Sequence, residues 1–217
     1  MELYLSSYRL GNNVDKLIEW KNKHGNKIIV IPNAGDIYSD SEIKTLKVLE
    51  KCKDLEEIGF ETQIVDLRDY FNNPHKLIDD IGETKAFYVI GGNVFCLRRA
   101  MKLSGFDAYL RKIANSPDYL YSGFSAGICV LAKDLHGIHL VDDPEKDPYN
   151  FGSIIWDGLG IIDFMPVPHY DTPNHGESHL MYNVVKYMEE NDLPYVTLKD
   201  GEYLDDNFRY DKNTKKI

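Results

Sequence analysis

The sequence predicts an α/β fold in which a doubly wound, mostly parallel sheet carries helices on both faces. Apolar runs rich in β-branched or aromatic residues, such as Lys27–Pro32 and Ala86–Ile90, are typical of buried parallel strands. Strands and helical segments alternate at intervals of about 25–35 residues from Lys27 to Leu131, the rhythm of a βαβ arrangement. Because no internal repeat, low-complexity stretch or linker interrupts the chain, we expect a single domain over residues 1–217.

Composition narrows the functional class. The net charge of −10 and the lack of a basic stripe argue against nucleic-acid binding. Cys52, Cys96 and Cys129 are widely spaced in apolar surroundings, which favours reduced core residues over a disulfide framework or a metal site. The N-terminus lacks the pattern of a signal peptide, and no apolar run reaches the length of a membrane span. We therefore expect a cytoplasmic protein that contacts neither nucleic acid nor membrane; its oligomeric state stays open, with a homodimer among the options.

The elements before residue 120 follow from hydrophobic periodicity and from turn residues. The expected strands are Glu2–Tyr8, Lys27–Pro32, Thr62–Leu67 and Ala86–Ile90. Ser39 and Glu42 have the spacing of a capping box. The helix that follows carries a stripe of apolar residues, Ile43, Leu46, Leu49, Cys52, Leu55 and Ile58, and Gly59 suits its C-cap. The other expected helices are Val14–Trp20, Lys76–Ile81, Val94–Met101 and Ala108–Ala114, and Asn93 can cap the third of these.

The second half of the chain is less regular. Residues 135–152 are rich in polar and turn residues and predict a long loop, with room for a hairpin. The prolines of Phe164–His169 predict an extended segment. Leu180–Asn191 is expected to be a helix, and Pro194–Leu198 a strand whose hairpin partner is Glu202–Leu204. The charged tail, Asp205–Ile217, is expected to meander or fray.

Between these halves lies a motif with chemical meaning. An apolar strand from Tyr119 leads into Gly123-Phe-Ser-Ala-Gly127, the G-x-S-x-G pattern of a nucleophile elbow with Ser125 at its tip. The turn needs small neighbours because it presents the serine on a strained backbone, and its N–H groups can stabilise an oxyanion. An ordinary strand-to-helix turn would show the same five residues, but the preceding strand and the Ala-Gly that follows favour a nucleophile.

A serine nucleophile requires a base and an acid that orients it. His169 ends the apolar segment Phe164–Pro168, where a strand would present it at the rim of a sheet, and we take it as the base. Four carboxylates are candidates for the acid: Asp142, Asp143, Asp171 and Asp200. A metal site is the alternative use of the cluster His169, Asp171, His175 and His179. We expect no metal there, because the spacing does not match a H-E-x-x-H helix and no cysteine is near.

Several blocks resemble peptidase family S51, the serine peptidases that include aspartyl dipeptidase and cyanophycinase. These blocks occur in the family's order: Leu3-Tyr-Leu-Ser-Ser-Tyr8, Lys27-Ile-Ile-Val-Ile-Pro-Asn-Ala34, Tyr88-Val-Ile-Gly-Gly-Asn-Val-Phe-Cys-Leu97, Gly123–Gly127, Pro168-His-Tyr170, Gly176-Glu-Ser178 and Leu198-Lys-Asp-Gly201. The resemblance implies a sheet related to the class I glutamine amidotransferase-like fold. It also implies a Ser-His-acid enzyme with Ser125, His169 and Asp200 as the triad, although aspartyl dipeptidase has a glutamate in place of Asp200.

The resemblance further implies that the backbone N–H groups of Gly92 and Ala126 form an oxyanion hole. Asn93, Glu177 and His179 would contact substrate, and Glu177 could bind a substrate amine. His179 stands where aspartyl dipeptidase has an arginine, and a histidine cannot make the same bidentate clamp on a carboxylate. Aspartyl specificity is therefore not implied for this chain, although the loop at residues 135–152 would cover the site and favour short peptides.

The sequence thus predicts a serine-type peptidase that hydrolyses short peptides, dipeptidase-like, through an acyl-enzyme and without a cofactor. Two other functions share the scaffold. An amidase or amidotransferase-like hydrolase would use the same site on a non-peptide substrate, and a non-catalytic binding protein would not bring Ser125, His169 and Asp200 together. A panel of peptide and non-peptide substrates distinguishes the peptidase from the amidase, and a structure distinguishes the peptidase from the non-catalytic protein.

Overall fold

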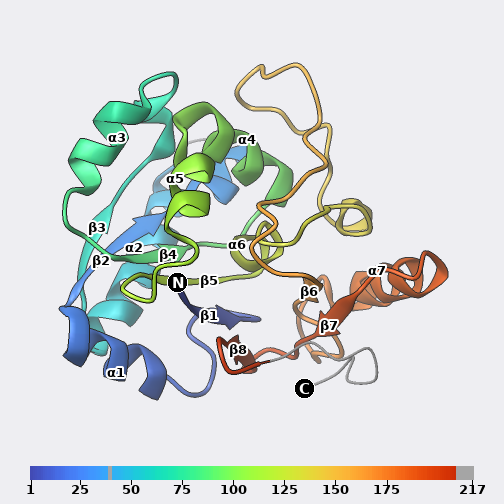
Figure 1. The fold of residues 1–217 in the computed structure, drawn as a ribbon. Helices are drawn as coiled ribbons and strands as arrows, with labels where there is room; N and C mark the ends of the chain where they lie inside the picture. Colours follow the sequence, from blue (N-terminus) through green and yellow to red (C-terminus); the bar gives the residue numbers. More distant parts are fainter. Residues whose placement is uncertain (39–40, 209–217) are drawn as a thin grey trace.

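A six-stranded sheet forms the centre of the molecule in this computed structural model, which describes residues 1–38 and 41–208 (Figure 1). The strands lie in the order β3-β2-β4-β5-β1-β8. Their bounds are β1 Glu2–Ser6, β2 Lys27–Ile31, β3 Glu61–Ile64, β4 Ala86–Val89, β5 Leu120–Phe124 and β8 Tyr203–Asp205. The neighbours from β3 to β1 pair in parallel, and β8 alone runs antiparallel, along β1. The predicted α/β fold with a mostly parallel sheet is confirmed.

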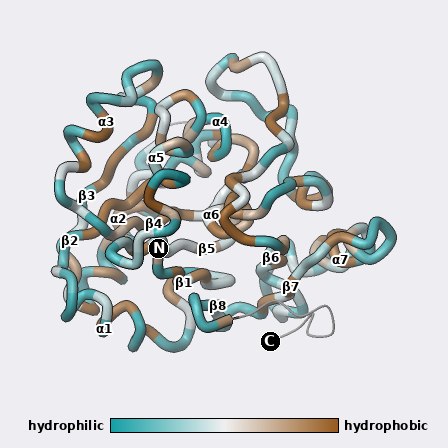
Figure 2. The backbone as a smooth tube through the Cα atoms, viewed as in Figure 1, coloured by the Kyte–Doolittle hydropathy of each residue, from teal (hydrophilic) through white to brown (hydrophobic). Residues whose placement is uncertain are grey.

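Helices cover both faces of this sheet because successive strand residues point to opposite sides. In β2, Ile28 and Val30 pack in one core with residues of α1 (Asp15–His24) and α2 (Glu42–Glu57). Ile29 and Ile31 pack in the other core, with the helices of the opposite face. Those helices are α3 (Pro74–Ile81), α4 (Val94–Ser104), α5 (Phe106–Ile113) and α6 (Ala126–Cys129). Figure 2 shows hydrophobic residues along β4 and α6, in keeping with strands buried on both faces.

A second, two-stranded sheet overturns the predicted C-terminal hairpin. β7 (Tyr195–Thr197) pairs in parallel with β6 (Met165–Val167), and α7 (Ser178–Glu190) connects them. The chain then crosses to the edge of the main sheet, where β8 pairs with β1. The turn at Asp200 therefore links two different sheets, and a local hairpin pattern could not distinguish this from two strands that pair with each other.

The predicted apolar stripe of α2 is buried only in part. Cys52 and Leu55 are buried, but Ile43, Leu46 and Leu49 are 48–67% exposed. Only the C-terminal half of α2 lies against the sheet. The apolar residues that recur in its first half are therefore not buried. Ser41 is the N-cap of the helix, and its Oγ accepts a hydrogen bond from the Lys44 N–H. The predicted N-cap, Ser39, lies outside the described residues, as do residues 209–217 of the predicted tail.

The described part of the chain also contains three short 3₁₀ helices, at Asn33–Ile37, Leu67–Tyr70 and Ile138–Leu140. The second replaces the end of the expected strand Thr62–Leu67, because Asp66 caps it through a hydrogen bond from the Arg68 N–H. The third lies in the long loop at residues 135–152, where a strand or hairpin is absent from the described structure. Among the residues with described positions, no helix is both long and apolar enough to cross a bilayer.

Candidate active site

Ser125 stands on a strained turn between β5 and α6. Its backbone angles, φ 52° and ψ −125°, lie outside the regions that a serine ordinarily occupies. The chain reaches this turn from a fully buried strand and leaves it in a short buried helix. The strain is therefore imposed from both sides, and it holds the serine at the carboxyl end of a central strand. This is the geometry that the G-x-S-x-G pattern predicts.

The two flanking glycines are required by close approach to β4. A Cβ atom at Gly123 would lie 2.6 Å from the carbonyl oxygen of Val89, and one at Gly127 only 2.2 Å from the same atom. These contacts involve backbone, which cannot move without disturbing the sheet. The glycines therefore allow the turn to pack against the neighbouring strand β4.

His169 follows β6 and points its ring toward Asp200. The side chain is 2% exposed, and its backbone has a positive φ of 59°. His169 Nδ1 lies 2.7 Å from Asp200 Oδ1, so Nδ1 carries the proton and donates to the carboxylate. Burial raises the pKa of Asp200, but the hydrogen bonds from His169 and Ser7 outweigh it and hold that pKa below its ordinary value. This tautomer leaves Nε2 available as a hydrogen-bond acceptor.

Ser7 joins this pair through its side chain and was missed by the sequence analysis. Its Oγ donates to Asp200 Oδ1 at 2.8 Å and accepts the backbone N–H of His169 at 2.8 Å. The residue lies just past β1 and is fully buried. A polar residue directly after a buried parallel strand was the available signal, because the carboxyl ends of such strands meet at one edge of the sheet.

A cavity of about 270 Å³ brings most of the predicted residues together. Ser125, His169 and Glu177 line it, and so do Gly92 and Asn93. Among described groups, the backbone N–H groups of Gly92 and Ala126 have no hydrogen-bond acceptor. Asn93 caps α4 as expected, through a bond from the Cys96 N–H, and its Nδ2 donates to the carbonyl of Asp143. That bond ties the long loop to the wall of the cavity.

The long loop supplies one side of this cavity through Val141, Asp142, Asp143 and Lys146. In the hydrogen bonds of the described residues, His169 contacts Asp200 and neither of these two aspartates. Asp142 Oδ2 instead accepts the Val94 N–H at 2.7 Å, at the start of α4. Burial raises the pKa of Asp142 to about 7; the bond from Val94 opposes this rise, and the charge of Glu177 adds to it.

His175 packs directly on the imidazole of His169. The two rings are parallel within 3°, with centroids 3.8 Å apart, and Tyr8 meets both of them edge-on. Burial and then the neighbouring His169 lower the pKa of His175. His179, by contrast, is exposed on α7 and does not line the cavity. The structure thus brings His175 to the site and leaves His179 outside it.

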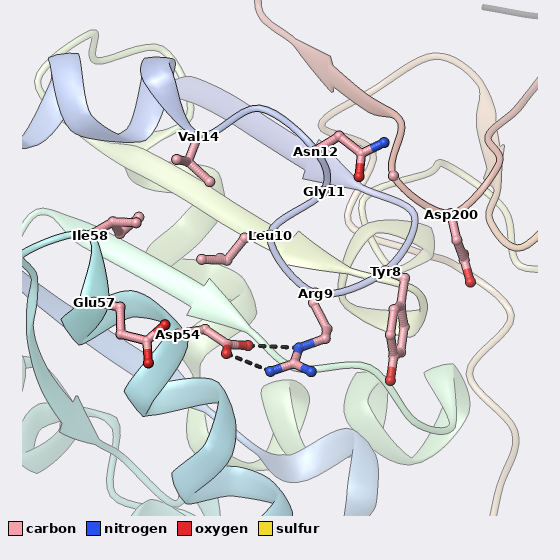
Figure 3. Close-up of a pocket in the computed structure, with 11 residues that line it drawn as sticks. Tyr8, Arg9, Leu10, Gly11, Asn12, Val14, Asp54, Glu57, Ile58 and Asp200 are labelled. Carbon is pink, nitrogen blue, oxygen red and sulfur yellow. Dashed lines mark hydrogen bonds and ion pairs between the residues drawn. The ribbon is translucent and has the colours of Figure 1, made fainter.

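Two further cavities adjoin this one and share Tyr8 as a wall. One, of about 680 Å³, extends over Gly91, Phe124 and Glu177 toward α2. The other, of about 490 Å³, lies between Asp200 and the ion pair of Arg9 with Asp54 (Figure 3). Figure 3 shows the Tyr8 and Asp200 side chains on one side of it and the Arg9–Asp54 pair on the other.

Comparisons with known proteins agree with this architecture. The chain is 30% identical over 129 residues to "Peptidase E" of Streptomyces coelicolor, covering 57% of this chain and 49% of that protein. It therefore spans about half of that relative. It is 28% identical over 151 residues to an uncharacterized peptidase of Listeria monocytogenes, covering 69% of this chain and 68% of the relative.

Solved structures show the same fold. A candidate peptidase E protein from Listeria monocytogenes EGD-e superposes with a TM-score of 0.72 at 22% identity, over 96% of this chain and 98% of that one. A peptidase from an acI-B1 actinobacterium gives a TM-score of 0.65 at 17% identity, over 94% and 82% of the two chains.

The family assignment follows from a match that extends over nearly the whole chain. The model of peptidase family S51 matches residues 6–207, a range that includes Ser125, His169 and Asp200. The predicted resemblance and the predicted enzyme class are both confirmed. This protein belongs to peptidase family S51 and is a serine-type peptidase.

Proposed function

We propose that this peptidase hydrolyses short peptides, dipeptides above all, through an acyl-enzyme formed on Ser125. The observation that carries the proposal is the 2.7 Å contact between His169 Nδ1 and Asp200 Oδ1. His169 also lines the same cavity as Ser125. A carboxylate that fixes an imidazole tautomer is the arrangement by which a histidine activates a serine.

The first chemical step is attack by Ser125 Oγ on the carbonyl carbon of the peptide bond. His169 Nε2 takes the hydroxyl proton, and Asp200 stabilises the imidazolium that results. The N–H groups of Gly92 and Ala126 are free to donate to the oxyanion of the tetrahedral intermediate. Each such donor contributes about 3–4 kcal/mol to transition-state stabilisation.

The intermediate then collapses and the carbon–nitrogen bond breaks. The imidazolium returns its proton to the leaving amine, which departs, and an ester on Ser125 remains. Water repeats the sequence with His169 as base, which releases the acid and restores the serine. Every proton moves through one nitrogen of one ring, so the tautomer held by Asp200 matters in both halves of the reaction.

The long loop and the charge of the cavity support a short substrate with a free amine. The loop closes one side of the cavity of about 270 Å³, and the cavity of about 680 Å³ adjoins it at Tyr8 and Glu177. Glu177, Asp142 and Asp143 supply carboxylates, and among the described lining residues Lys146 is the only lysine or arginine. We propose that Glu177 binds the substrate ammonium, and that the absence of an arginine among the described lining residues removes a strict preference for aspartate.

A panel of Xaa-Yaa dipeptides, each with a free and an acetylated amine, tests this proposal by release of the C-terminal amino acid. Free dipeptides should be turned over, and acetylation should lower kcat/KM by at least tenfold. Ser125→Ala sets the background. Turnover of acetylated peptides, long peptides or simple amides at rates equal to those of free dipeptides would contradict the proposed substrate class.

A further inference from the structure

We propose that His169, His175 and Glu177 form a binding site for a divalent transition-metal ion, Zn²⁺ in particular, and that the ion inhibits the enzyme reversibly by occupying the base. One ligand atom from each side chain lies within 4.8 Å of the others. Two histidines and a glutamate are a known three-ligand set for zinc, with a fourth position left open. All three line the cavity that contains Ser125.

His169 is already oriented as a metal ligand. Its Nδ1–H donates to Asp200, which directs Nε2 away from that carboxylate. Histidines that bind metals almost always donate their other ring N–H to a carboxylate or carbonyl, which fixes the ring and raises its basicity. The contact that prepares His169 to accept a proton therefore prepares it equally to accept Zn²⁺.

The other two ligands must move by a small amount. Zinc bonds of about 2.0–2.2 Å in tetrahedral geometry place ligand atoms roughly 3.4 Å apart. Parallel rings cannot both direct an in-plane lone pair at one ion, so His175 has to tilt out of its stack on His169. Its ring contacts Tyr8 and His169, and its Nδ1 accepts a long hydrogen bond of 3.3 Å from the Glu177 N–H. A neutral His175 therefore carries its proton on Nε2, and it must give up this bond or change tautomer to bind the ion. A Cβ atom added at the next residue, Gly176, would meet nothing within 4 Å, so open space lies beside the backbone at that residue.

The charge of the cavity favours a cation. Asp143 and Glu177 bring carboxylates to it, and among the described lining residues Lys146 is the only lysine or arginine. A bound ion would remove Nε2 of His169 from the reaction, so Ser125 would lose its base. The proposed inhibition depends on the proposed function, in which His169 is the catalytic base. Binding of the ion does not depend on it.

Calorimetric titration with ZnCl₂ tests binding without reference to activity, and Ser125→Ala serves as the parent protein because that residue is not a ligand. We expect saturable one-to-one binding. Glu177→Gln changes an exposed side chain and should weaken binding at least tenfold. His175→Phe keeps an aromatic ring on His169 and should do the same. Asp200→Asn should weaken binding by roughly 10- to 100-fold.

Two matched controls locate the ion. His179→Ala removes an exposed histidine of α7, and His136→Ala removes one of a second histidine pair, with His139 at 6.2 Å between ring centroids. Both should bind zinc like the parent. Equal affinity in Glu177→Gln and His175→Phe, loss of binding in His136→Ala, or no saturable binding would each overturn the site.

Labelling of the unmodified enzyme by a fluorophosphonate tests the consequence. Zinc should block the label, and a chelator should restore it. If zinc binds with the expected variant pattern and labelling stays unchanged, the metal site stands and the inhibitory role of the ion is wrong. If the protein shows no turnover of any peptide, the proposed substrate class fails independently of the titration.

Discussion

The hydroxyl of Ser7 donates a 2.8 Å hydrogen bond to Asp200 Oδ1, the oxygen that also receives the Nδ1–H of His169. Ser7 accepts the backbone N–H of His169 as well, so one side chain ties both Asp200 and His169 to the end of β1. The carboxylate of Asp200 is thus held by two donors from different parts of the chain. His169 is held by its ring through Asp200 and by its backbone N–H through Ser7.

Replacement of Ser7 by alanine should impair catalysis while the fold persists. The lost hydrogen bond is to a charged group, which contributes about 1.5–3 kcal/mol, so kcat/KM should fall by roughly 10- to 150-fold. Ser122→Ala is the matched control. It removes another fully buried hydroxyl, which donates to the carbonyl of Phe87 in the sheet. If both variants lose the same activity, Ser7 has no specific role.

Asp200→Asn and Asp142→Asn should separate the triad acid from its alternative. An asparagine at position 200 favours the wrong tautomer of His169, and kcat should fall by roughly 10³- to 10⁴-fold. An asparagine at position 142 keeps an oxygen for the Val94 N–H and should cost far less in kcat. Steady-state kinetics on one dipeptide measures both, and the reverse order of the two losses would assign the acid to Asp142.

Asp142 should make a contribution to the stability of the protein that decreases as pH rises from about 4 to 7. Its pKa is raised to about 7 by burial, whereas in the unfolded chain it is near the ordinary value of about 3.9. Between these values the folded state holds a proton that the unfolded state releases, so the free energy of unfolding decreases with pH. Asp142→Asn removes this titration.

Urea unfolding at pH 4.5 and pH 8 measures this effect. Relative to the unmodified protein, Asp142→Asn should gain about 1–4 kcal/mol in the free energy of unfolding between the two pH values. Asp143→Asn, at an exposed neighbouring carboxylate, should show no such gain. An Asp142→Asn difference that is independent of pH would mean that Asp142 titrates normally.

Gly127→Ala should destabilise the protein because its Cβ would lie 2.2 Å from the carbonyl oxygen of Val89. Overpacking against a backbone atom costs about 1–3 kcal/mol or more. For a chain of this size each kcal/mol lowers Tm by about 2–4 °C. Gly176→Ala is the control, because a Cβ there meets nothing within 4 Å. Equal melting temperatures for the two variants would show that the elbow tolerates a side chain.

Much of the fold was predictable from the sequence because buried parallel strands and their helices produce strong local patterns. The apolar runs at β2, β4 and β5 marked the centre of the sheet, and the G-x-S-x-G turn marked the point where Ser125 emerges. The pairing of β7 with β6 was not predictable in this way. It depends on contacts between segments separated by α7, whereas hydrophobic alternation reports only which residues are buried.

The candidate site was predictable to the extent that sequence blocks identified it. His169 and Asp200 were both expected, and the structure places them in contact. Ser7 and His175 were not assigned roles, because their positions depend on how distant loops meet at the edge of the sheet. His179 was expected near substrate from its place in a motif, but the first turn of α7 points it outward and brings His175 to the cavity instead.

The central claim is that Ser125 is the nucleophile, and a fluorophosphonate probe followed by peptide mapping tests it most directly. The unmodified protein should carry one adduct, on Ser125, and lose its peptidase activity in proportion to labelling. Ser125→Ala should carry none and should not hydrolyse dipeptides. An adduct on another residue, or equal labelling and turnover in Ser125→Ala, would contradict the account.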